Sequence, residues 1–592
     1  MNLSTPDLII VFGFFLVTIL IGVASAKRAG KGFKEYFLSG RKMPWWLLGI
    51  SMVATTFSAD TPNLVSEIVR KDGIAGNWVW WAFLVTGMLT VFIYAKLWRR
   101  SGISTDLEFY EIRYGGRGAA FLRGFRAIYL GLIFNIIILA SVLLAGIKIS
   151  STMLGMSAEK TVLIISVITL FYTVLGGLRS VILTDLFQFI IAMVGSIWAA
   201  VYIVNMPEVG GLNEILSRPE LQDSLRFVPE LSNREAWMAL LVIPLAVQWW
   251  AVWYPGAEPG GGGYIVQRML SAKNESHAVG ASLLFNIAHY GLRPWPWILI
   301  ALASLVVFPE LEDLQRAFPH IDESVIADDL SYSAMLTYLP SGLLGLVLAS
   351  LIAAVMSTLS THLNWGASYA VNDFYHRFIR PEASEKELVS AGRIFTVFIL
   401  LVAAFLALRL DSALEVFNII LLIGAGTGLL FILRWFWWRI NAMSEIAAML
   451  ISFVVAILLT LVLPDHYEFW DNMPDYYRLL IGVLVTTAAW VTVTFLTPAE
   501  SDETLMGFIK KVRPHLFGFK TVIKRNKVQP EDIKTSNFSK ELSAMFAGIF
   551  MVYAALFGTG FWIYGMWLEG SIATVVFLLG IYILFKIRAS VF

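Results

Sequence analysis

Hydroxyl side chains gather in one long apolar segment of the sequence. Four of them fall within five positions: Ser357, Thr358, Ser360 and Thr361. In a helix, residues three, four and seven positions apart share a face, which places Ala354 together with all of them except Ser360. Hydroxyl oxygens suit a hard cation such as Na⁺, although the same residues also pack helices together or bond to the preceding turn.

Two further apolar segments contain interruptions. The first carries Ala54-Thr-Thr-Phe-Ser-Ala-Asp-Thr-Pro62, and the second runs from Gln248-Trp-Trp-Ala-Val-Trp-Tyr254 through Pro255 and a glycine-rich stretch to Tyr264. A broken membrane helix exposes backbone carbonyls, and in transporters built from inverted repeats such breaks hold the ion and the substrate. We therefore expect the breaks and the hydroxyl cluster to form one site.

Carboxylates within the apolar segments are a third feature. Asp185 lies in an otherwise apolar run, where a charge is costly and marks an ion or proton path unless it pairs with Arg179 or Gln188. Asp60 and Glu258 lie in the two breaks. They either contact a substrate or face a water-filled vestibule.

Aromatic and basic side chains near these segments have two interpretations. An aromatic face stacks on a sugar ring or holds a cation, but it also anchors a helix at the membrane surface. The residues concerned in the second break are Trp249, Trp250, Trp253 and Tyr254. We interpret His289 and Arg293, and the run Leu433-Arg-Trp-Phe-Trp-Trp-Arg439, as interfacial anchors.

The elements that position these residues must be membrane helices. The chain has 592 residues, of which 58% are hydrophobic and 15% charged, whereas a soluble protein has roughly a quarter of charged residues. Apolar stretches of about 20 residues recur along the chain, and each must satisfy its own backbone as a helix. The net charge of +1 favours no nucleic acid, and the absence of Cys excludes disulfides and thiolate sites.

We predict an all-α integral membrane protein with about 15 transmembrane helices. Their approximate ranges are 8–26, 45–68, 77–98, 119–149, 160–176, 180–204, 236–254, 278–308, 333–372, 389–409, 413–437, 441–463, 477–497, 543–566 and 568–588. The two breaks fall in spans 45–68 and 236–254, which suits a core of two inverted repeats of five helices each. The predicted parts are an N-terminal helix and loop (1–44), a first repeat (45–204), a second repeat (236–437) and accessory helices (438–592).

Loop charges predict the orientation. Lys and Arg concentrate in every second loop, beginning with 27–42 and including Arg268 with Lys273, whereas loop 309–332 is acidic. Because cytoplasmic loops carry the excess of Lys and Arg, we expect a cell-membrane protein with its N-terminus outside and its C-terminus in the cytoplasm. The segment 498–541 is then a basic cytoplasmic linker.

Four segments, taken in order, carry a family resemblance. They are Tyr36-Phe-Leu-Ser-Gly-Arg-Lys-Met-Pro-Trp-Trp46, Tyr172-Thr-Val-Leu-Gly-Gly-Leu-Arg-Ser180, Tyr264-Ile-Val-Gln-Arg-Met-Leu-Ser-Ala-Lys273 and Met356-Ser-Thr-Leu-Ser-Thr361. Together they resemble the sodium:solute symporter family, which contains the sodium/glucose, proline, pantothenate and sialic acid symporters and has the leucine-transporter fold. The resemblance covers roughly Leu8 to Arg439 and implies sodium-coupled symport by alternating access.

The resemblance also implies ligands for sodium. The common site of the family corresponds here to the carbonyls of Ala54, Phe57 and Ala354 and the hydroxyls of Ser357 and Thr358. A second site, found in some members, corresponds to Asp185, Ser357, Ser360 and Thr361. Two coupling Na⁺ ions are therefore expected, and the second depends on Asp185.

The expected substrate pocket differs from that of the family's sugar carriers. Thr61 and Gly262 stand where those carriers have Gln and Asn, no lysine lies near Ile298, and Phe417 or Asn418 replaces a glutamine. Sugar specificity is therefore not transferred. Substrate contacts are expected at Asp60, Thr61, Gln248, Trp249, Trp253, Glu258, Tyr264 and Asn418.

The combined prediction is a sodium-coupled symporter that imports a small organic solute, with a sugar or polyol favoured. Nucleotide-binding and zinc-hydrolase motifs are absent from the sequence, so we expect no enzyme and an ion gradient as the energy source. A proton-coupled, carboxylate or amino-acid carrier on the same fold is the alternative. A channel or a membrane sensor fits less well. The expected partners are the solute, Na⁺ and the lipid bilayer, without nucleic acid.

Overall fold

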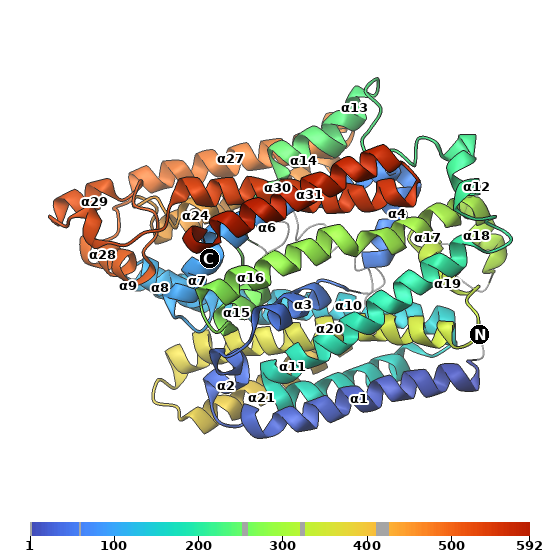
Figure 1. Ribbon diagram of the computed structural model, residues 1–592. Coiled ribbons are helices and arrows are strands. Elements are labelled where there is room, and N and C mark those ends of the chain that lie inside the picture. Colours follow the sequence, from blue (N-terminus) through green and yellow to red (C-terminus); the bar gives the residue numbers. More distant parts are fainter. Residues whose placement is uncertain (1–2, 59–60, 252–257, 320–325, 410–425, 592) are drawn as a thin grey trace.

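Helices make up the fold, as the composition predicts. The computed structural model describes residues 3–58, 61–251, 258–319, 326–409 and 426–591. Over these ranges there is no sheet, only an isolated bridge between Met43 and Ala272. Figure 1 shows long helices that lie side by side with their axes roughly aligned. The all-α prediction is confirmed.

The first part of the chain forms α1 to α11. Their bounds are α1 Thr5–Ala29, α2 Phe33–Leu38, α3 Trp45–Thr55, α4 Thr61–Asp72, α5 Trp78–Trp81, α6 Leu84–Leu89, α7 Ala95–Ser101, α8 Phe109–Arg113, α9 Gly116–Ile128, α10 Asn135–Leu154 and α11 Ala158–Val204. Wider helical turns at Thr90–Tyr94 and Tyr129–Phe134 join α6 to α7 and α9 to α10. Each joined pair is long enough to cross a bilayer.

The helix α11 contains two of the predicted spans. Its 47 residues would extend about 70 Å if straight, more than twice the roughly 30 Å of a hydrocarbon core. Gly177 divides it, because its φ of 54° and ψ of −154° are not helical. A Cβ at this position would come within 2.5 Å of the Tyr36 carbonyl oxygen, so the turn requires glycine for space as well as for conformation.

The central part of the chain forms α12 to α21. Their bounds are α12 Leu212–Ser217, α13 Arg234–Ala236, α14 Ile243–Ala246, α15 Gly263–Ser271, α16 Glu275–Asn286, α17 Pro294–Val307, α18 Leu311–Ala317, α19 Leu330–Leu336, α20 Leu343–Tyr369 and α21 Glu385–Ala407. Wider turns at Ile287–Leu292 join α16 to α17, and Ala370–Ile379 extends α20. Both predicted breaks lie at helix ends, the first between α3 and α4 and the second between α14 and α15.

The last part of the chain forms α23 to α31. Their bounds are α23 Gly428–Leu433, α24 Ala442–Ile457, α25 Leu463–His466, α26 Glu468–Asp471, α27 Asp475–Leu496, α28 Asp502–Val512, α29 Lys520–Arg525, α30 Phe538–Ile563 and α31 Trp567–Val591. Among the described residues, 11 helical stretches are long and apolar enough to span a membrane. The number of about 15 stays a prediction, as do the repeat boundaries, because segment 413–437 is only partly described.

The loops that are rich in Lys and Arg and the acidic loop lie at different ends of the molecule. In Figure 1, α2, α8, α28 and α29 lie at the left-hand end, and the C-terminus lies toward the same end. The N-terminus lies at the right-hand end with α12 and α18. Basic and acidic loops therefore lie at opposite ends, as predicted. Arg268 is the exception, because it is fully buried and not part of a surface loop.

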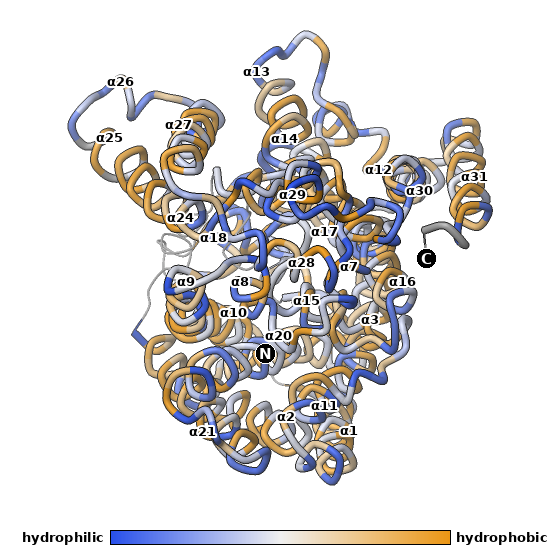
Figure 2. The backbone as a smooth tube through the Cα atoms, turned by 90° about the vertical axis from the view of Figure 1, so that its left-hand side faces the viewer, coloured by the Kyte–Doolittle hydropathy of each residue, from blue (hydrophilic) through white to orange (hydrophobic). Residues whose placement is uncertain are grey.

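The helix α20 is the centre of the fold. Of the most apolar window of Leu343–Ile379, 94% is buried, against 22% for α1 and for Trp567–Arg588. In Figure 2 the outer helices α1, α27 and α31 are coloured mainly as hydrophobic, as helices in contact with lipid are expected to be. The hydroxyl cluster thus lies on the most enclosed helix, which α3 and α11 contact directly.

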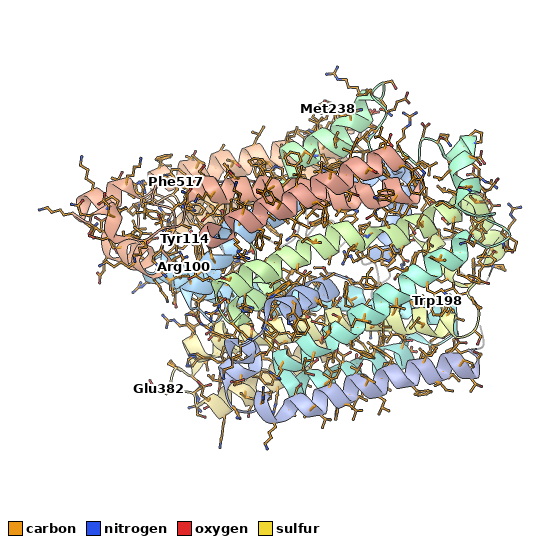
Figure 3. The ribbon with its side chains drawn as sticks, in the orientation of Figure 1. Arg100, Tyr114, Trp198, Met238, Glu382 and Phe517 are labelled. Carbon is orange, nitrogen blue, oxygen red and sulfur yellow. The ribbon has the colours of Figure 1, made fainter. Side chains whose placement is uncertain are left out.

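The segment 498–541 is packed against the helices, not a free linker. α28 lies against α7 and α8, and the Phe508 ring lies 6.1 Å from that of Trp435. Arg100 donates to the Val512 carbonyl at 3.2 Å. Figure 3 shows Arg100, Tyr114 and Phe517 at this end of the molecule. Trp435 is 1% exposed, so its interpretation as an interfacial anchor is wrong.

A buried ionic cluster ties the end of this segment to the first part of the chain. Glu541 at the start of α30 contacts the Lys96 ammonium group of α7, and it lies 2.7 Å from His515 Nε2. Glu541 is fully buried, and Lys96 is 4% exposed. The carboxylate therefore joins α30 to α7 and to the loop between α28 and α29.

Candidate functional site

The end of α3 meets α20 around a small cavity. Ala54, Phe57 and Ala354 line it together with Ser357, and α11 closes one side with Gln188. Its volume is about 10 Å³, which is room for one water-sized sphere. The cavity brings together four of the five residues predicted for the first sodium site.

The fifth predicted residue, Thr358, joins the same two helices. Its hydroxyl donates to the Thr55 carbonyl at 3.3 Å and to the Ala354 carbonyl at 3.1 Å. The last turn of a helix leaves carbonyls without partners within the helix. At the end of α3, the Thr55 carbonyl is satisfied by this hydroxyl of α20, whereas the Ala54 carbonyl accepts from the Phe57 backbone N–H at 3.1 Å.

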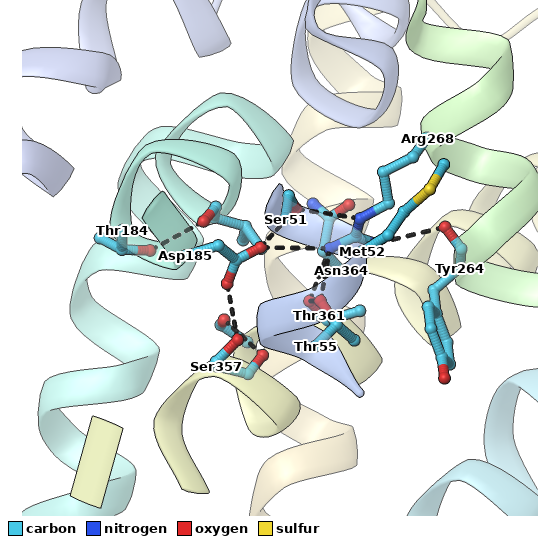
Figure 4. A network of polar contacts seen from close by, with 12 residues as sticks. Ser51, Met52, Thr55, Thr184, Asp185, Tyr264, Arg268, Ser357, Thr361 and Asn364 are labelled. Carbon is cyan, nitrogen blue, oxygen red and sulfur yellow. Dashed lines mark hydrogen bonds and ion pairs between the residues drawn. The ribbon is translucent and has the colours of Figure 1, made fainter. Parts of the chain in front are cut away.

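Asp185 of α11 is the acceptor of a second buried network, shown in Figure 4. Ser51 donates to Asp185 Oδ2 at 2.5 Å, and Ser357 donates to Oδ1 at 2.7 Å. The carboxylate is fully buried. Ser357 therefore belongs to both networks, because it also lines the cavity.

Arg268 of α15 supplies the positive charge of the second network. Its Nη2 donates to Thr361 Oγ1 at 2.7 Å and to Thr55 Oγ1 at 3.1 Å, and it lies 3.5 Å from Asp185 Oδ2. Its Nε donates to Ser51 Oγ at 3.2 Å. The guanidinium thus contacts oxygens of the predicted second sodium site.

The remaining residue predicted for the second sodium site makes a local contact. Ser360 donates to the Ser357 carbonyl at 3.1 Å, within its own helix.

Sequence reasoning missed Ser51, Thr55 and Arg268. The four-residue spacing of Ser51 and Thr55 gave a signal for a polar face on α3, whereas nothing local indicated that Arg268 turns inward.

The predicted substrate residues that the structure describes lie along both breaks. Gln248 donates to the Val79 carbonyl at 2.8 Å, and the Trp249 carbonyl accepts from Thr86, which places the second break against α5 and α6. Thr61 begins α4 and is partly exposed. The Tyr264 ring packs 5.5 Å from that of His362. Asp60, Trp253 and Asn418 lie outside the described residues.

Glu258, also predicted to contact substrate, forms a buried ion pair with Arg126 of α9. Next to it, Asp106 accepts from the Gly263 backbone N–H at 3.0 Å and from the Tyr369 hydroxyl. Burial, with the nearby Glu258 carboxylate, raises the pKa of Asp106 to about 6. Asp106 thus holds the start of α15 against the loop before α8, and Glu258 ties the preceding segment to α9.

His289 and Arg293 do not anchor the protein at the membrane surface. They are 7% and 2% exposed, and both contact the Thr56 hydroxyl at the end of α3. The interpretation as interfacial anchors is wrong, because the turn before α17 faces the first break and not the lipid.

Most of the chain matches the model of one known protein family. The model of the sodium:solute symporter family matches residues 36–452. The chain belongs to the sodium:solute symporter family. This symporter is a multi-pass membrane transporter, not an enzyme, and sodium is the ion that it couples to the transport of a small solute.

Similar proteins agree with this family. The chain is 26% identical over 516 residues to the sodium/glucose cotransporter of Vibrio parahaemolyticus, covering 84% of this symporter and 91% of that protein. It is 28% identical over 553 residues to the sodium/myo-inositol cotransporter of Canis lupus familiaris, covering 85% and 74%. The fold is shared with a Na⁺-coupled sialic acid symporter in a substrate-bound outward-open state, at TM-score 0.67 and 20% identity, over 84% of this chain and 100% of that chain.

Proposed function

We propose that this symporter imports a sugar or polyol with Na⁺ across the cell membrane, with its N-terminus outside and its C-terminus in the cytoplasm. The proposed ion site is supported above all by the cavity that Ala54, Phe57, Ala354 and Ser357 line. The solute class is supported by the names of the relatives, which transport glucose and myo-inositol. The orientation is supported by the basic loops at one end of the molecule.

The first Na⁺ binds where α3 ends against α20. It takes the carbonyls of the cavity and the hydroxyls of Ser357 and Thr358, in place of the bonds that Thr358 makes to neighbouring carbonyls. The ion then holds the first break in place for the solute. Sodium and solute must raise each other's affinity by the same factor, because binding coupling is reciprocal.

A second Na⁺ at Asp185 competes with Arg268. Ser357 and Thr361 supply the hydroxyls, but the guanidinium already bonds Thr361 and pairs with the carboxylate. Two cations cannot share these oxygens without repulsion. The second ion therefore binds only in a state in which Arg268 has left Asp185.

The solute lies between the two breaks. Asp60, Thr61, Gln248, Trp249, Trp253, Tyr264 and Asn418 are the residues proposed to contact it. Glu258 reaches the solute only when its ion pair with Arg126 opens. Rocking of the broken helices against the central α20 then exposes the solute to the cytoplasm.

The decisive experiment measures solute uptake into proteoliposomes under an inward Na⁺ gradient, with a K⁺ gradient as reference. A thermal-stability screen of sugars, polyols, carboxylates and amino acids, with and without Na⁺, selects the solute. Joint replacement Ser357→Ala and Thr358→Ala is expected to abolish sodium-stimulated uptake while the protein remains folded. Undiminished uptake by the double variant would refute the proposed ion site.

A further inference from the structure

The two networks of the site leave one buried polar side chain unexplained. Gln188 of α11 is 2% exposed. In the part of the chain that the structure describes, neither the oxygen nor the nitrogen of its amide has a hydrogen-bond partner. Nearly all buried polar groups in folded proteins are paired, because burial without a partner gives up the bonds to water and gains none in return. The unpaired amide of Gln188 therefore points to a ligand or to a bound water.

Gln188 borders the cavity at the end of α3. It lines this space together with Ala54 of α3 and with Ala354 and Ser357 of α20. Among all the residues that line the cavity, Gln188 and Ser357 are the two with polar side chains. The helix α11 is thus the one wall of the cavity that has a polar side chain but no ligand in the proposed first ion site.

The other polar side chain of the cavity is already fixed by α11. Ser357 donates its hydroxyl proton to Asp185 Oδ1 at 2.7 Å, as Figure 4 shows. A hydroxyl oxygen that has donated its proton in this way keeps its lone pairs for a cation. Asp185 and Gln188 lie three positions apart, so they share one face of α11. This face therefore orients Ser357 through Asp185 and borders the cavity through Gln188.

A tyrosine hydroxyl near the amide does not occupy its oxygen. Tyr172, from the first half of α11, lies near Gln188. Its hydroxyl donates its single proton to the Met356 carbonyl at 3.0 Å. Tyr172 can therefore only accept from Gln188, and only through the amide nitrogen. The amide oxygen stays available on the side of the cavity.

An amide oxygen suits the ion that this symporter uses. Hard cations bind oxygen ligands, and the side-chain carbonyls of Asn and Gln are among these ligands. The five residues proposed for the first site offer three backbone carbonyls and two hydroxyls, all from α3, the first break and α20. An oxygen from α11 adds a ligand on a side of the cavity from which none has been assigned.

We propose that the amide oxygen of Gln188 is a further ligand of the first Na⁺ ion. This inference rests on the proposed function, because it adds a sixth oxygen and a third helix to the proposed ion site. The ion then holds the end of α3 against both α11 and α20. The amide finds its partner when the ion binds, which explains why it has no partner within the protein.

A purely structural role for a buried amide predicts different behaviour, and Asn135 of α10 illustrates it. Asn135 donates to the His362 carbonyl at 2.7 Å, and its own oxygen lies 2.7 Å from His362 Nδ1. Both ends of this amide join α10 to α20, so its loss destabilises the protein in any salt. Gln188 makes no such bonds, so an apolar replacement should weaken only the sodium-bound protein.

The test measures the melting temperature of the full-length protein over a series of Na⁺ concentrations, with K⁺ keeping the ionic strength constant. Gln188→Met keeps the length of the side chain but replaces the amide by a thioether, which is a soft ligand. In K⁺ alone, we expect Gln188→Met to melt at or above the temperature of wild type. The Na⁺ concentration for half-maximal stabilisation should rise about tenfold, and that for half-maximal solute uptake by the same factor.

Two further variants identify the oxygen as the cause. Gln188→Glu keeps an oxygen at the same position, and we expect it to need no more Na⁺ than wild type. Asn135→Leu is the matched control, because it removes a buried amide that is paired; its melting temperature should fall equally in Na⁺ and in K⁺, with an unchanged midpoint for Na⁺. An unchanged midpoint in Gln188→Met would overturn the inference and leave a bound water as the partner of the amide.

The remaining outcomes separate this inference from the proposed function. If joint replacement of Ser357 and Thr358 by Ala abolishes stabilisation by Na⁺ but Gln188→Met does not alter it, the ion site stands and Gln188 is not a ligand. If Na⁺ does not stabilise wild type relative to K⁺, the ion site and the inference both fail. Should Gln188→Met not fold, Gln188→Asn decides, because it keeps the amide and withdraws the oxygen by one methylene; an unchanged midpoint in that variant refutes the inference.

Discussion

The two predicted sodium sites share α20 and Ser357. They differ in whether a positively charged side chain of the protein already contacts their oxygens. The first proposed site lies at the end of α3, beside a cavity of about 10 Å³ that Ala54, Phe57, Ala354 and Ser357 line. The second has a carboxylate and hydroxyls that are bonded to Arg268. Oxygens that suit a metal cation are therefore not enough to define a sodium site, because a charged side chain such as Arg268 can bind the same oxygens.

This difference separates the proposed roles of the sites. The five residues proposed for the first site carry no charge, so we expect a Na⁺ ion there to add one without displacing a side-chain cation. The second is balanced by its own ion pair, so Na⁺ must replace Arg268. The first ion then depends on local geometry, and the second depends on the position of α15.

The largest expected effect comes from Arg268→Ala. Removing one partner of a buried ion pair leaves Asp185 without compensation, which costs about 3–5 kcal/mol of stability. We expect a large fall in melting temperature and a larger rise on adding Na⁺ than wild type shows, because the ion takes the place of the guanidinium. Thermal melts in Na⁺ and in K⁺ measure both.

The matched control is Arg377→Ala, which removes an exposed pair worth at most about 1 kcal/mol. Equal melting temperatures for the two variants would show that Arg268 and Asp185 do not balance each other. A destabilised Arg268→Ala protein without extra response to Na⁺ would exclude a second ion at Asp185.

A smaller effect is expected from Thr358→Ala, which alters the first site alone. Loss of one hydroxyl ligand should raise the Na⁺ concentration for half-maximal uptake by about tenfold, corresponding to roughly 1.4 kcal/mol. Thr358→Ser retains the oxygen and serves as control. If both variants respond to Na⁺ as wild type does, Thr358 is not a ligand and only joins α3 to α20.

Asp185→Asn tests the number of ions. The amide keeps the shape of the carboxylate but removes the charge that a second Na⁺ requires. If two ions bind, the Hill slope of uptake against Na⁺ concentration should fall from nearly two toward one. A slope of one in wild type that the substitution leaves unchanged would eliminate the second ion.

The smallest effect is expected from Ser360→Ala. Its hydroxyl donates to the Ser357 carbonyl within its own helix, and a single neutral hydrogen bond contributes about 1 kcal/mol net to stability. Uptake and its dependence on Na⁺ should stay close to wild type. A strong loss of sodium response would instead assign Ser360 to the second site, as the family resemblance implies.

Local patterns in the sequence predicted much of the fold. Apolar length gave the helices, Pro and Gly gave the breaks, and the hydroxyl spacing placed Ser357 and Thr358 on the face that meets α3. The family resemblance placed Ala54 and Phe57 beside them. These features depend on neighbouring residues or on recognisable motifs, which is why they were accessible before the fold was known.

Long-range pairing could not be predicted in the same way. Arg268 was counted with the surface loops and Arg293 with the interfacial anchors, because an arginine beside Lys273 or next to a Pro-Trp run looks like a membrane boundary. The direction in which each side chain points depends on how α15 and α17 pack against α3. That packing involves residues more than 200 positions apart, such as Thr55 and Arg268.

The Glu541 cluster has a consequence for the order of synthesis. Lys96 is buried on α7, and the carboxylate that it contacts lies 445 residues later in the chain. While the protein is being made, Lys96 must keep its ammonium group in water until α30 emerges. The helices around α7 can therefore insert early, but they reach their final packing only after α30 has been translated.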